Sequence, residues 1–261
     1  MDDTKQHLTH IKNGVKITYM NYLNKLNEIN NNTRYSRRKL AYGTSGAGLC
    51  HLKHYFRSIN EKRKEVPFDS MCKMRLGTLV HEDIQNALTH MFEEYKVMCE
   101  LPVQYFNVRG HLDVAIEIYD KNVMLIDIKT MAAYPWSKKY GRDKEAHASV
   151  WSKYQLATYS LGLKQEYGYE NVYMYLLNYN KNTSAMKFEE VQATFFEGQA
   201  KEYWEQVTDF VKALTKAVGE GYDFIEQVAA LDTVMRAPVH NWECGYCDYS
   251  DICPAKYVKE K

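Results

Sequence analysis

Apolar residues recur at helical spacing in two long segments in the first part of the chain. Within residues 4–30 they recur at steps of three and four, which predicts an amphipathic helix. Within residues 69–95 a second apolar stripe predicts a longer helix, which Asp69 or Ser70 could cap. Between the two, the Gly-rich stretch 43–48 precedes a short predicted helix.

Strand-like segments dominate the middle of the chain. They cover residues 100–108, 111–119 and 123–130, with turns expected at Arg109–Gly110 and at residues 120–122. Such short connections predict an antiparallel meander. A helix at 150–168, strands at 171–180 and 185–193, and a helix at 195–218 are predicted next. This order predicts an α/β fold in which helices pack on a mixed sheet.

Two charged residues interrupt the apolar strand at 123–130. Asp127 and Lys129 lie two positions apart, so they share one face of the strand, while Ile126 and Ile128 share the other. A buried Asp or Lys is costly unless it is paired or coordinated, so this pair indicates a functional site. A solvated ion pair on an antiparallel strand is the simpler alternative when the motif is considered alone.

Other polar residues could join this pair. Asp113 lies near the start of the preceding strand and can face Asp127 across the hairpin. Facing carboxylates repel each other, so a cation such as Mg²⁺ would stabilise them, whereas two acids at a sheet edge are the alternative. His81 lies one helical turn after Gly77, which could let a substrate approach closely.

Gln155 and Tyr159 lie at positions i and i+4, on one side of a predicted helix, although ordinary packing would also explain them. Together with Gly77 and His81, Gly110-x-x-Asp113 and Asp127-Ile128-Lys129, they form an ordered motif series. This series resembles that of RecB-type nucleases in the PD-(D/E)XK superfamily, over roughly residues 43–257. The chain departs from the superfamily label in having Gly-His-Leu-Asp in place of Pro-Asp, and Asp127 in place of Glu.

The resemblance implies a restriction-endonuclease-like core: a helix, a three-strand antiparallel meander, a helix and a strand, with flanking helices. It implies that Asp113, Asp127, His81 and the Ile128 carbonyl hold Mg²⁺ or Mn²⁺. Lys129 would position or deprotonate the attacking water, and Gln155 and Tyr159 would position the substrate. Glu100 could hydrogen-bond within the site and ranks below the others.

The cysteines suggest a second metal centre. Cys244, Cys247 and Cys253 form a C-x2-C-x5-C cluster, which suits a metal better than a core. Cys50 is the distant candidate for a fourth ligand, and Cys72 and Cys99 are expected to be ordinary buried residues. Zinc, with His240 or His51 as a ligand, is the rival to iron.

The Cys pattern resembles the iron-sulfur branch of this family, which includes the AddB nuclease domain and CRISPR-associated RecB-like exonucleases. This resemblance implies a structural 4Fe-4S cluster on Cys50, Cys244, Cys247 and Cys253, which would tie the two ends of the chain together. We therefore expect an N-terminal helix and basic linker at 1–40, and a nuclease domain at 41–261 that the cluster closes.

Composition narrows the class of protein. Hydrophobic residues make up 45% of the chain, enough for a large core, and the formal net charge is only +1. Local charge is uneven, because Glu61 is the only acid in the basic segment 34–64. We expect this segment to contact phosphates, with bases stacking on Tyr55 or Phe56. Its basic residues are Arg34, Arg37, Arg38, Lys39, Lys53, Arg57, Lys62, Arg63 and Lys64.

No apolar run is long enough for a membrane span, and the N-terminus lacks a secretory pattern, so we expect an intracellular, cytoplasmic protein. The expected function is that of a Mg²⁺- or Mn²⁺-dependent DNA exonuclease in recombination, repair or CRISPR spacer processing, whose protein partners could belong to those pathways. It would act on single strands or duplex ends, and endonuclease activity stays open. A non-catalytic, cluster-bearing DNA-binding subunit is the alternative, and a zinc-stabilised interaction protein is a third reading.

Overall fold

The computed structural model describes residues 17–26, 28–29, 42–91, 94–142, 149–234 and 243–253. The chain forms two compact units, one of Met1–Lys39 with Glu65–Val80, the other of Leu40–Lys64 with His81–Lys261. Helix α3 (Phe68–Met91) contributes to both. The domain boundary expected at residue 40 stays a prediction.

In the smaller unit, residues 17–26 and 28–29 are helical, within the helix predicted at 4–30. Tyr19 packs edge-to-face on Phe68, with ring centroids 6.1 Å apart. Four of the predicted phosphate-binding residues, Arg34, Arg37, Arg38 and Lys39, lie outside the described residues. Among the helices that the structure describes, none has the length and apolar character to cross a membrane.

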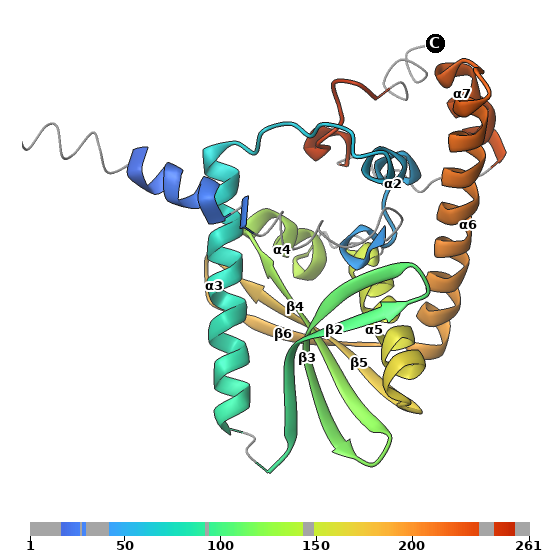
Figure 1. Cartoon of the computed structure of the whole chain (residues 1–261). Helices are drawn as coiled ribbons and strands as arrows, with labels where there is room; N and C mark the ends of the chain where they lie inside the picture. The colour runs from blue at the N-terminus through green and yellow to red at the C-terminus, as the bar shows by residue number, and fades with distance from the viewer. Residues whose placement is uncertain are drawn as a thin grey trace, which may run out of the picture. The chain divides into compact units, whose positions relative to one another are not determined.

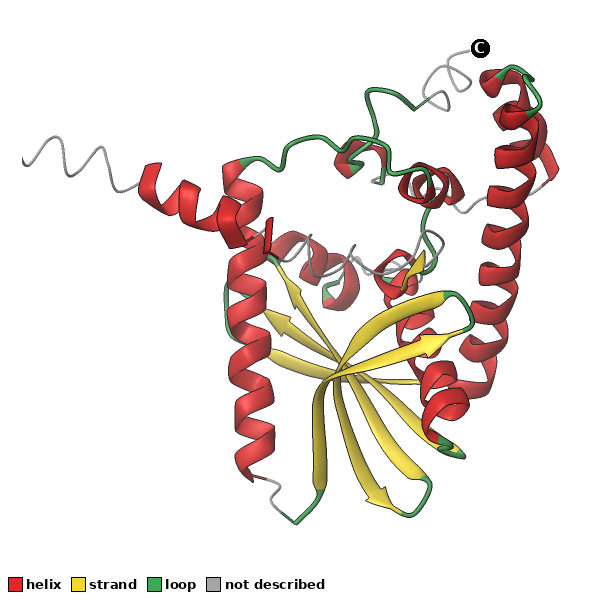
Figure 2. Ribbon diagram, viewed as in Figure 1, coloured by secondary structure: helices red, strands yellow, loops and turns green. Residues whose placement is uncertain are grey.

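The larger unit is built on a six-stranded mixed sheet of β1 (Tyr42–Gly43), β2 (Lys96–Tyr105), β3 (Val108–Tyr119), β4 (Asn122–Met131), β5 (Asn171–Asn180) and β6 (Met186–Val191). Strands β1 and β2 both pair with β3, and the order continues β3-β4-β5-β6. Strands β2, β3 and β4 form an antiparallel meander, β4 and β5 are parallel, and β5 and β6 are antiparallel. The predicted α/β core is therefore confirmed (Figures 1 and 2).

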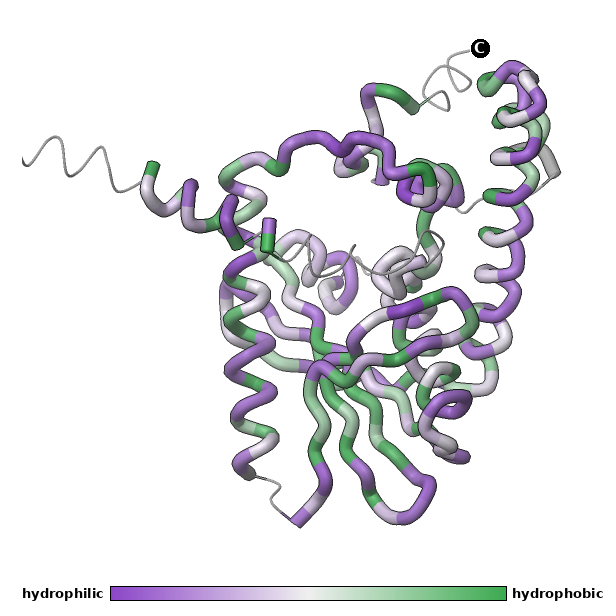
Figure 3. The backbone as a smooth tube through the Cα atoms, in the orientation of Figure 1, coloured by the Kyte–Doolittle hydropathy of each residue, from purple (hydrophilic) through white to green (hydrophobic). Residues whose placement is uncertain are grey.

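Both faces of the central strands are apolar, as their near-continuous hydrophobic runs require. On one face, Leu125 and Leu176 pack with Leu156 and Leu163 of α5 (Val150–Tyr167). On the other face, Ile126 and Ile128 pack in a separate cluster that includes Ile84 of α3. Figure 3 shows the resulting concentration of hydrophobic residues along these strands. A polar side chain on β4 is therefore enclosed on either face, which makes Asp127 and Lys129 exceptional.

A second, aromatic cluster joins α2 (His51–Ser58) to α6 (Ala193–Gly219). Tyr55 and Phe56, expected to stack on bases, are only 5% and 4% exposed within this cluster, so that expectation is wrong. The reason is tertiary: the apolar side of the short helix α2 is covered by α6, whose Phe210 and Trp204 belong to the same cluster.

The first hairpin differs from its prediction. The chain turns at Phe106–Asn107, where Phe106 has φ +48°, and Arg109 and Gly110 lie inside β3. A Cβ on Gly110 would collide with Thr44, approaching its Cγ2 to 2.8 Å and its Cβ to 2.9 Å. Gly110 therefore serves close packing and not a turn. Two helices, α4 (Ala133–Tyr140) and α7 (Phe224–Val234), were not predicted.

Candidate active site

The centre of the site is Asp127, which β4 carries into the interior. Its side chain is 1% exposed, and its Oδ2 lies 2.6 Å from Lys129 Nζ, as expected for two residues on one face of a strand. Within the described residues, its Oδ1 has no hydrogen-bond partner. Burial raises the pKa of Asp127 to about 6, although the charge of Lys129 opposes this rise. An enclosed carboxylate with an unpartnered oxygen is suited to binding a cation.

Asp113 joins the site from β3. Its Oδ2 accepts a hydrogen bond of 2.6 Å from the backbone N–H of Ile128, and its negative charge also raises the pKa of Asp127. Its Oδ1 lies 3.6 Å from Nδ1 of His81, on α3, which is an ion pair when the imidazole is protonated. These contacts bring together Asp113, Asp127, His81 and the residue whose carbonyl was predicted to bind metal, Ile128. Gly77, the expected partner of His81, belongs to the other unit.

Gln85, one turn after His81 on α3, hydrogen-bonds to the backbone of Asp113. Its Nε2 donates to the Asp113 carbonyl and to Glu100 Oε1, both at 2.9 Å. Glu100 has φ +50°, an uncommon conformation for a residue with a side chain. Glu100 thus hydrogen-bonds to Gln85 at the border of the site. The sequence did not single out Gln85.

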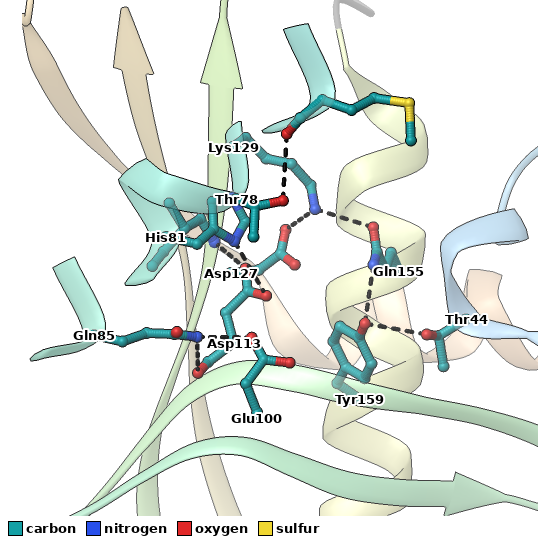
Figure 4. Close-up of polar contacts among 12 residues, drawn as sticks. Thr44, Thr78, His81, Gln85, Glu100, Asp113, Asp127, Lys129, Gln155 and Tyr159 are labelled. Atoms are coloured by element: carbon teal, nitrogen blue, oxygen red, sulfur yellow. Dashed lines mark hydrogen bonds and ion pairs between the residues drawn. The ribbon is translucent and has the colours of Figure 1, made fainter. Parts of the chain in front are cut away.

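Lys129 begins a chain of hydrogen bonds that leads away from the carboxylates (Figure 4). Its Nζ donates to Gln155 Oε1 at 3.0 Å, and Gln155 Nε2 donates to the Tyr159 hydroxyl at 2.9 Å. The same hydroxyl accepts a hydrogen bond of 3.1 Å from Thr44 Oγ1. Burial opposes the charge on Lys129, but Asp127 and Asp113 outweigh it and raise the pKa of the amine. Lys129 is therefore a protonated, oriented donor.

A second group of charges borders the site on α4, α5 and β6. Glu189 Oε2 lies 2.8 Å from Lys139 Nζ, and Glu189 Oε1 lies 2.6 Å from Lys153 Nζ. Lys139 also donates to Asn178 Oδ1 at 3.1 Å, and the positive charge of Lys129 contributes to lowering its pKa, after the larger effect of burial. Two lysines share one carboxylate here, so the group is positively charged as a whole. No periodic pattern in the sequence predicts this group of charges.

The donor set fits a hard divalent cation. Mg²⁺ is commonly held by one or two carboxylates together with waters, and the two acids here meet that need. The structure does not preassemble a larger set, because no group of three or more His, Cys, Asp or Glu side chains in the described segments is arranged to hold a metal ion.

Comparison with known families adds independent evidence. The family model of the PD-(D/E)XK nuclease superfamily matches residues 83–254, well over half of the chain. The chain belongs to the PD-(D/E)XK nuclease superfamily. The matched range contains Asp113, Asp127, Lys129, Gln155 and Tyr159, whereas His81 and Cys50 precede it.

Two solved structures are similar to this PD-(D/E)XK nuclease. The crystal structure of SSO0001 has 17% sequence identity and a TM-score of 0.53, covering 92% of this chain and 97% of that one, which supports the fold alone. A structure from Eubacterium rectale named "Putative exonuclease" has 14% identity and a TM-score of 0.42, covering 66% of this chain and 80% of that one. No curated protein matches the sequence.

Three of the four predicted cluster ligands of this nuclease lie against the aromatic cluster of α2 and α6. Cys50, Cys247 and Cys253 are half-buried against the aromatic cluster of α2 and α6, whereas Cys244 is exposed. Burial, followed by the charge of Glu243, raises the pKa of Cys50 to about 12, and Cys253 also contributes. Three of the four predicted cluster ligands, Cys50, Cys247 and Cys253, thus pack against the same aromatic cluster.

These thiols only partly fit a metal cluster. Metal ligation needs thiolates, and the Glu243 carboxylate, 2% exposed beside Cys50, disfavours them. His51, the rival zinc ligand, is fully buried between Tyr203 and Phe210, and neither ring nitrogen has a hydrogen-bond partner in the part of the chain described. His240 lies outside the described residues. Cys72 and Cys99 are half-buried.

Contacts that need no metal also hold the cysteine-rich segment 243–253 against residues 50–64. Glu243 Oε1 accepts a hydrogen bond of 2.9 Å from the backbone N–H of Cys50. Lys64 donates its backbone N–H to the Asp248 carbonyl at 3.0 Å, and its Nζ lies 2.6 Å from Asp251 Oδ1. Tyr249 is 1% exposed and packs on Phe56. A cluster would therefore reinforce a connection that these contacts already make.

Proposed function

We propose that this chain is a metal-dependent DNA exonuclease that acts on single strands or duplex ends. The observation that carries the proposal is the Asp127 carboxylate, which is enclosed, ion-paired to Lys129 through one oxygen and without a hydrogen-bond partner, among described residues, at the other. Asp113, Asp127, His81 and the Ile128 carbonyl would hold Mg²⁺ or Mn²⁺. When bound, this ion would polarise the scissile phosphate and lower the pKa of an attacking water.

Lys129 has an electrostatic role in this proposal. A general base must be neutral to accept a proton, but neighbouring carboxylates raise the pKa of Lys129 and keep it charged. Its ammonium, fixed between Asp127 and Gln155, would donate a hydrogen bond to the phosphate and offset the charge that develops there. Of the two roles considered for Lys129, orienting and neutralising is favoured over deprotonating the water.

The substrate would be a nucleic-acid strand with a phosphate directed to Lys153, which is 23% exposed beside the buried Lys139. These two lysines share the single carboxylate of Glu189, so an arriving phosphate meets excess positive charge beside Lys129. DNA as the substrate, and a role in recombination, repair or CRISPR spacer processing, rest on the motif resemblance.

We also propose a structural 4Fe-4S cluster on Cys50, Cys244, Cys247 and Cys253. The spacing of the last three and the shared location of Cys50, Cys247 and Cys253 support it. Phosphodiester hydrolysis needs no electron transfer, so the cluster would stabilise the fold and take no part in the reaction.

The test is cleavage of three end-labelled or internally labelled DNAs: a single strand, a linear duplex and a closed single-stranded circle. With Mg²⁺ or Mn²⁺, the linear DNAs should shorten progressively from their ends, the circle should persist, and EDTA should stop the reaction. Binding of DNA without cleavage in either metal would instead indicate a non-catalytic DNA-binding subunit. Cutting of the circle would replace the exonuclease assignment with an endonuclease.

A further inference from the structure

Thr44 occupies a position that connects the start of the larger unit to the candidate active site. It opens the 3₁₀ turn η1 (Thr44–Gly46), directly after β1, and its side chain is buried at 4% exposure. Its Oγ1 donates to the Tyr159 hydroxyl, 115 positions later in the chain. Strand β1 itself pairs with β3, with Gly43 opposite Arg109, so Thr44 lies at the strand that carries Asp113.

Gly110 makes this position of Thr44 sterically allowed. A side chain at residue 110 would occupy the volume of the Thr44 side chain, since even a Cβ would lie 2.8 Å from Thr44 Cγ2. Gly110 is also part of the Gly-x-x-Asp motif that ends at Asp113. The glycine therefore leaves room for a specific neighbour on the same strand as a predicted metal ligand.

The polarity of the hydrogen-bond chain makes Lys129 dependent on Thr44. An ammonium can only donate, so Gln155 must direct its Oε1 to Lys129, which leaves its Nε2 to donate to Tyr159. The Tyr159 hydroxyl is held between this amide and Thr44 Oγ1 (Figure 4). Removing the Thr44 hydroxyl would leave the Tyr159 hydroxyl bonded on one side only. Gln155, and the Lys129 ammonium bonded to it, would then be held less firmly in place.

We propose that Thr44 is a positioning residue for Lys129, acting through Tyr159 and Gln155, and that Gly110 is a glycine because Thr44 must lie there. Thr44 touches none of the reacting groups, and its effect is on the placement of the Lys129 ammonium. The inference rests on the proposed nuclease function of Lys129.

The test compares Thr44→Val with Thr44→Ser in steady-state cleavage of an end-labelled single strand with Mn²⁺. Valine keeps the volume and removes the hydroxyl, so kcat should fall roughly ten- to a hundredfold, as small displacements of reacting groups do, while KM stays near its wild-type value. Serine keeps the hydroxyl and should recover most of kcat. Gly110→Ala should resemble Thr44→Val. Gly43→Ala is the matched control, since its Cβ would meet only Ser45 Oγ, at 3.7 Å.

A double variant separates positioning from packing. Tyr159→Phe already breaks the chain, so adding Thr44→Val to it should cost little more, whereas independent packing effects would add. An unchanged kcat in Thr44→Val, an equal loss in Thr44→Ser, or full additivity would each overturn the inference. Lys129→Ala in the same assay distinguishes a failure of the proposed active site from a failure of the proposed role of Thr44. If it keeps wild-type activity, the proposed site itself fails; if it is inactive while Thr44→Val is normal, only the role of Thr44 fails.

Discussion

The carboxylate of Asp113 accepts a 2.6 Å hydrogen bond from the backbone N–H of Ile128, so a predicted metal ligand on β3 also holds β4 in place. The residue on β4 that it binds lies directly between Asp127 and Lys129. One of the two acids at the site thus adds a hydrogen bond between β3 and β4 beyond their backbone pairing.

This double role predicts that Asp113 variants differ in stability. Asp113→Ala leaves the Ile128 N–H without its acceptor and should lower the free energy of unfolding by about 1–3 kcal/mol, whereas Asp113→Asn keeps an acceptor and should lose less. Both should lose cleavage. Urea unfolding measures the difference, with the exposed Asp209→Ala as control. Equal stability of the alanine and asparagine variants would contradict this role.

Lys153 should contribute to substrate binding and not to the chemical step. It is 23% exposed, and shares Glu189 with Lys139, so it can reach a phosphate outside the metal site. Lys153→Gln should weaken binding of a single strand. It should also lower the slope of log Kd against log salt concentration by about one, the value for one lost phosphate contact. Lys216→Gln, at the exposed end of α6, is the control. An unchanged salt slope in Lys153→Gln would place the strand elsewhere.

The buried His54 should make the fold sensitive to acid. Its Nε2 lies 3.0 Å from the Gly46 carbonyl, and burial, helped by the charge of Arg57, lowers its pKa to about 3. Between pH 6.5 and 3 the imidazole of His54 would therefore bind a proton in the unfolded chain but not in the native state. This one group should lower the free energy of unfolding by up to about 1.4 kcal/mol per pH unit as pH falls through that window.

His54→Gln keeps a donor for the Gly46 carbonyl but cannot take up a proton. Its free energy of unfolding should fall less steeply than that of the wild type between pH 6.5 and 4, measured by urea titration at each pH. The exposed His111→Gln should leave the slope unchanged. Parallel pH profiles for wild type and His54→Gln would show that His54 does not cause the acid sensitivity.

Protein prepared without oxygen should contain about four irons and absorb broadly in the visible range. Cys50→Ser should lose the iron and the colour, whereas Cys72→Ser should keep both. Because Lys64, Glu243 and Tyr249 hold segment 243–253 without metal, Cys50→Ser should lower the Tm but remain folded. Stoichiometric zinc in place of iron would contradict the assignment of an iron-sulfur cluster. Full iron content in Cys50→Ser would contradict the assignment of Cys50 as the fourth ligand.

What could be predicted from the sequence followed from local periodicity. The alternation of side chains along a strand predicted that Asp127 and Lys129 share a face, and the helical i, i+4 spacing predicted that Gln155 and Tyr159 lie together. The structure brings these four side chains into one connected group. The order of helices and strands likewise predicted the mixed sheet.

The features that escaped prediction depend on contacts between distant segments. Glycine is a residue type typical of turns, and only the closeness of Thr44 explains why Gly110 lies inside β3. The true turn contains Phe106 at φ +48°, a residue type that no turn rule favours there. Tyr55 resembled an exposed stacking residue because Phe224 of α7, on which its ring stacks, lies far away in sequence.

In the proposed reaction, the Asp127 carboxylate serves metal-dependent cleavage. The most direct measurement is single-turnover cleavage of an end-labelled single strand by Asp127→Asn and wild type at saturating Mn²⁺, with melting temperatures measured on the same samples. The amide keeps the size of the carboxylate and removes its charge, so the variant should remain folded and bind DNA but lose cleavage by at least about a thousandfold. Wild-type cleavage by a well-folded Asp127→Asn protein would contradict the account.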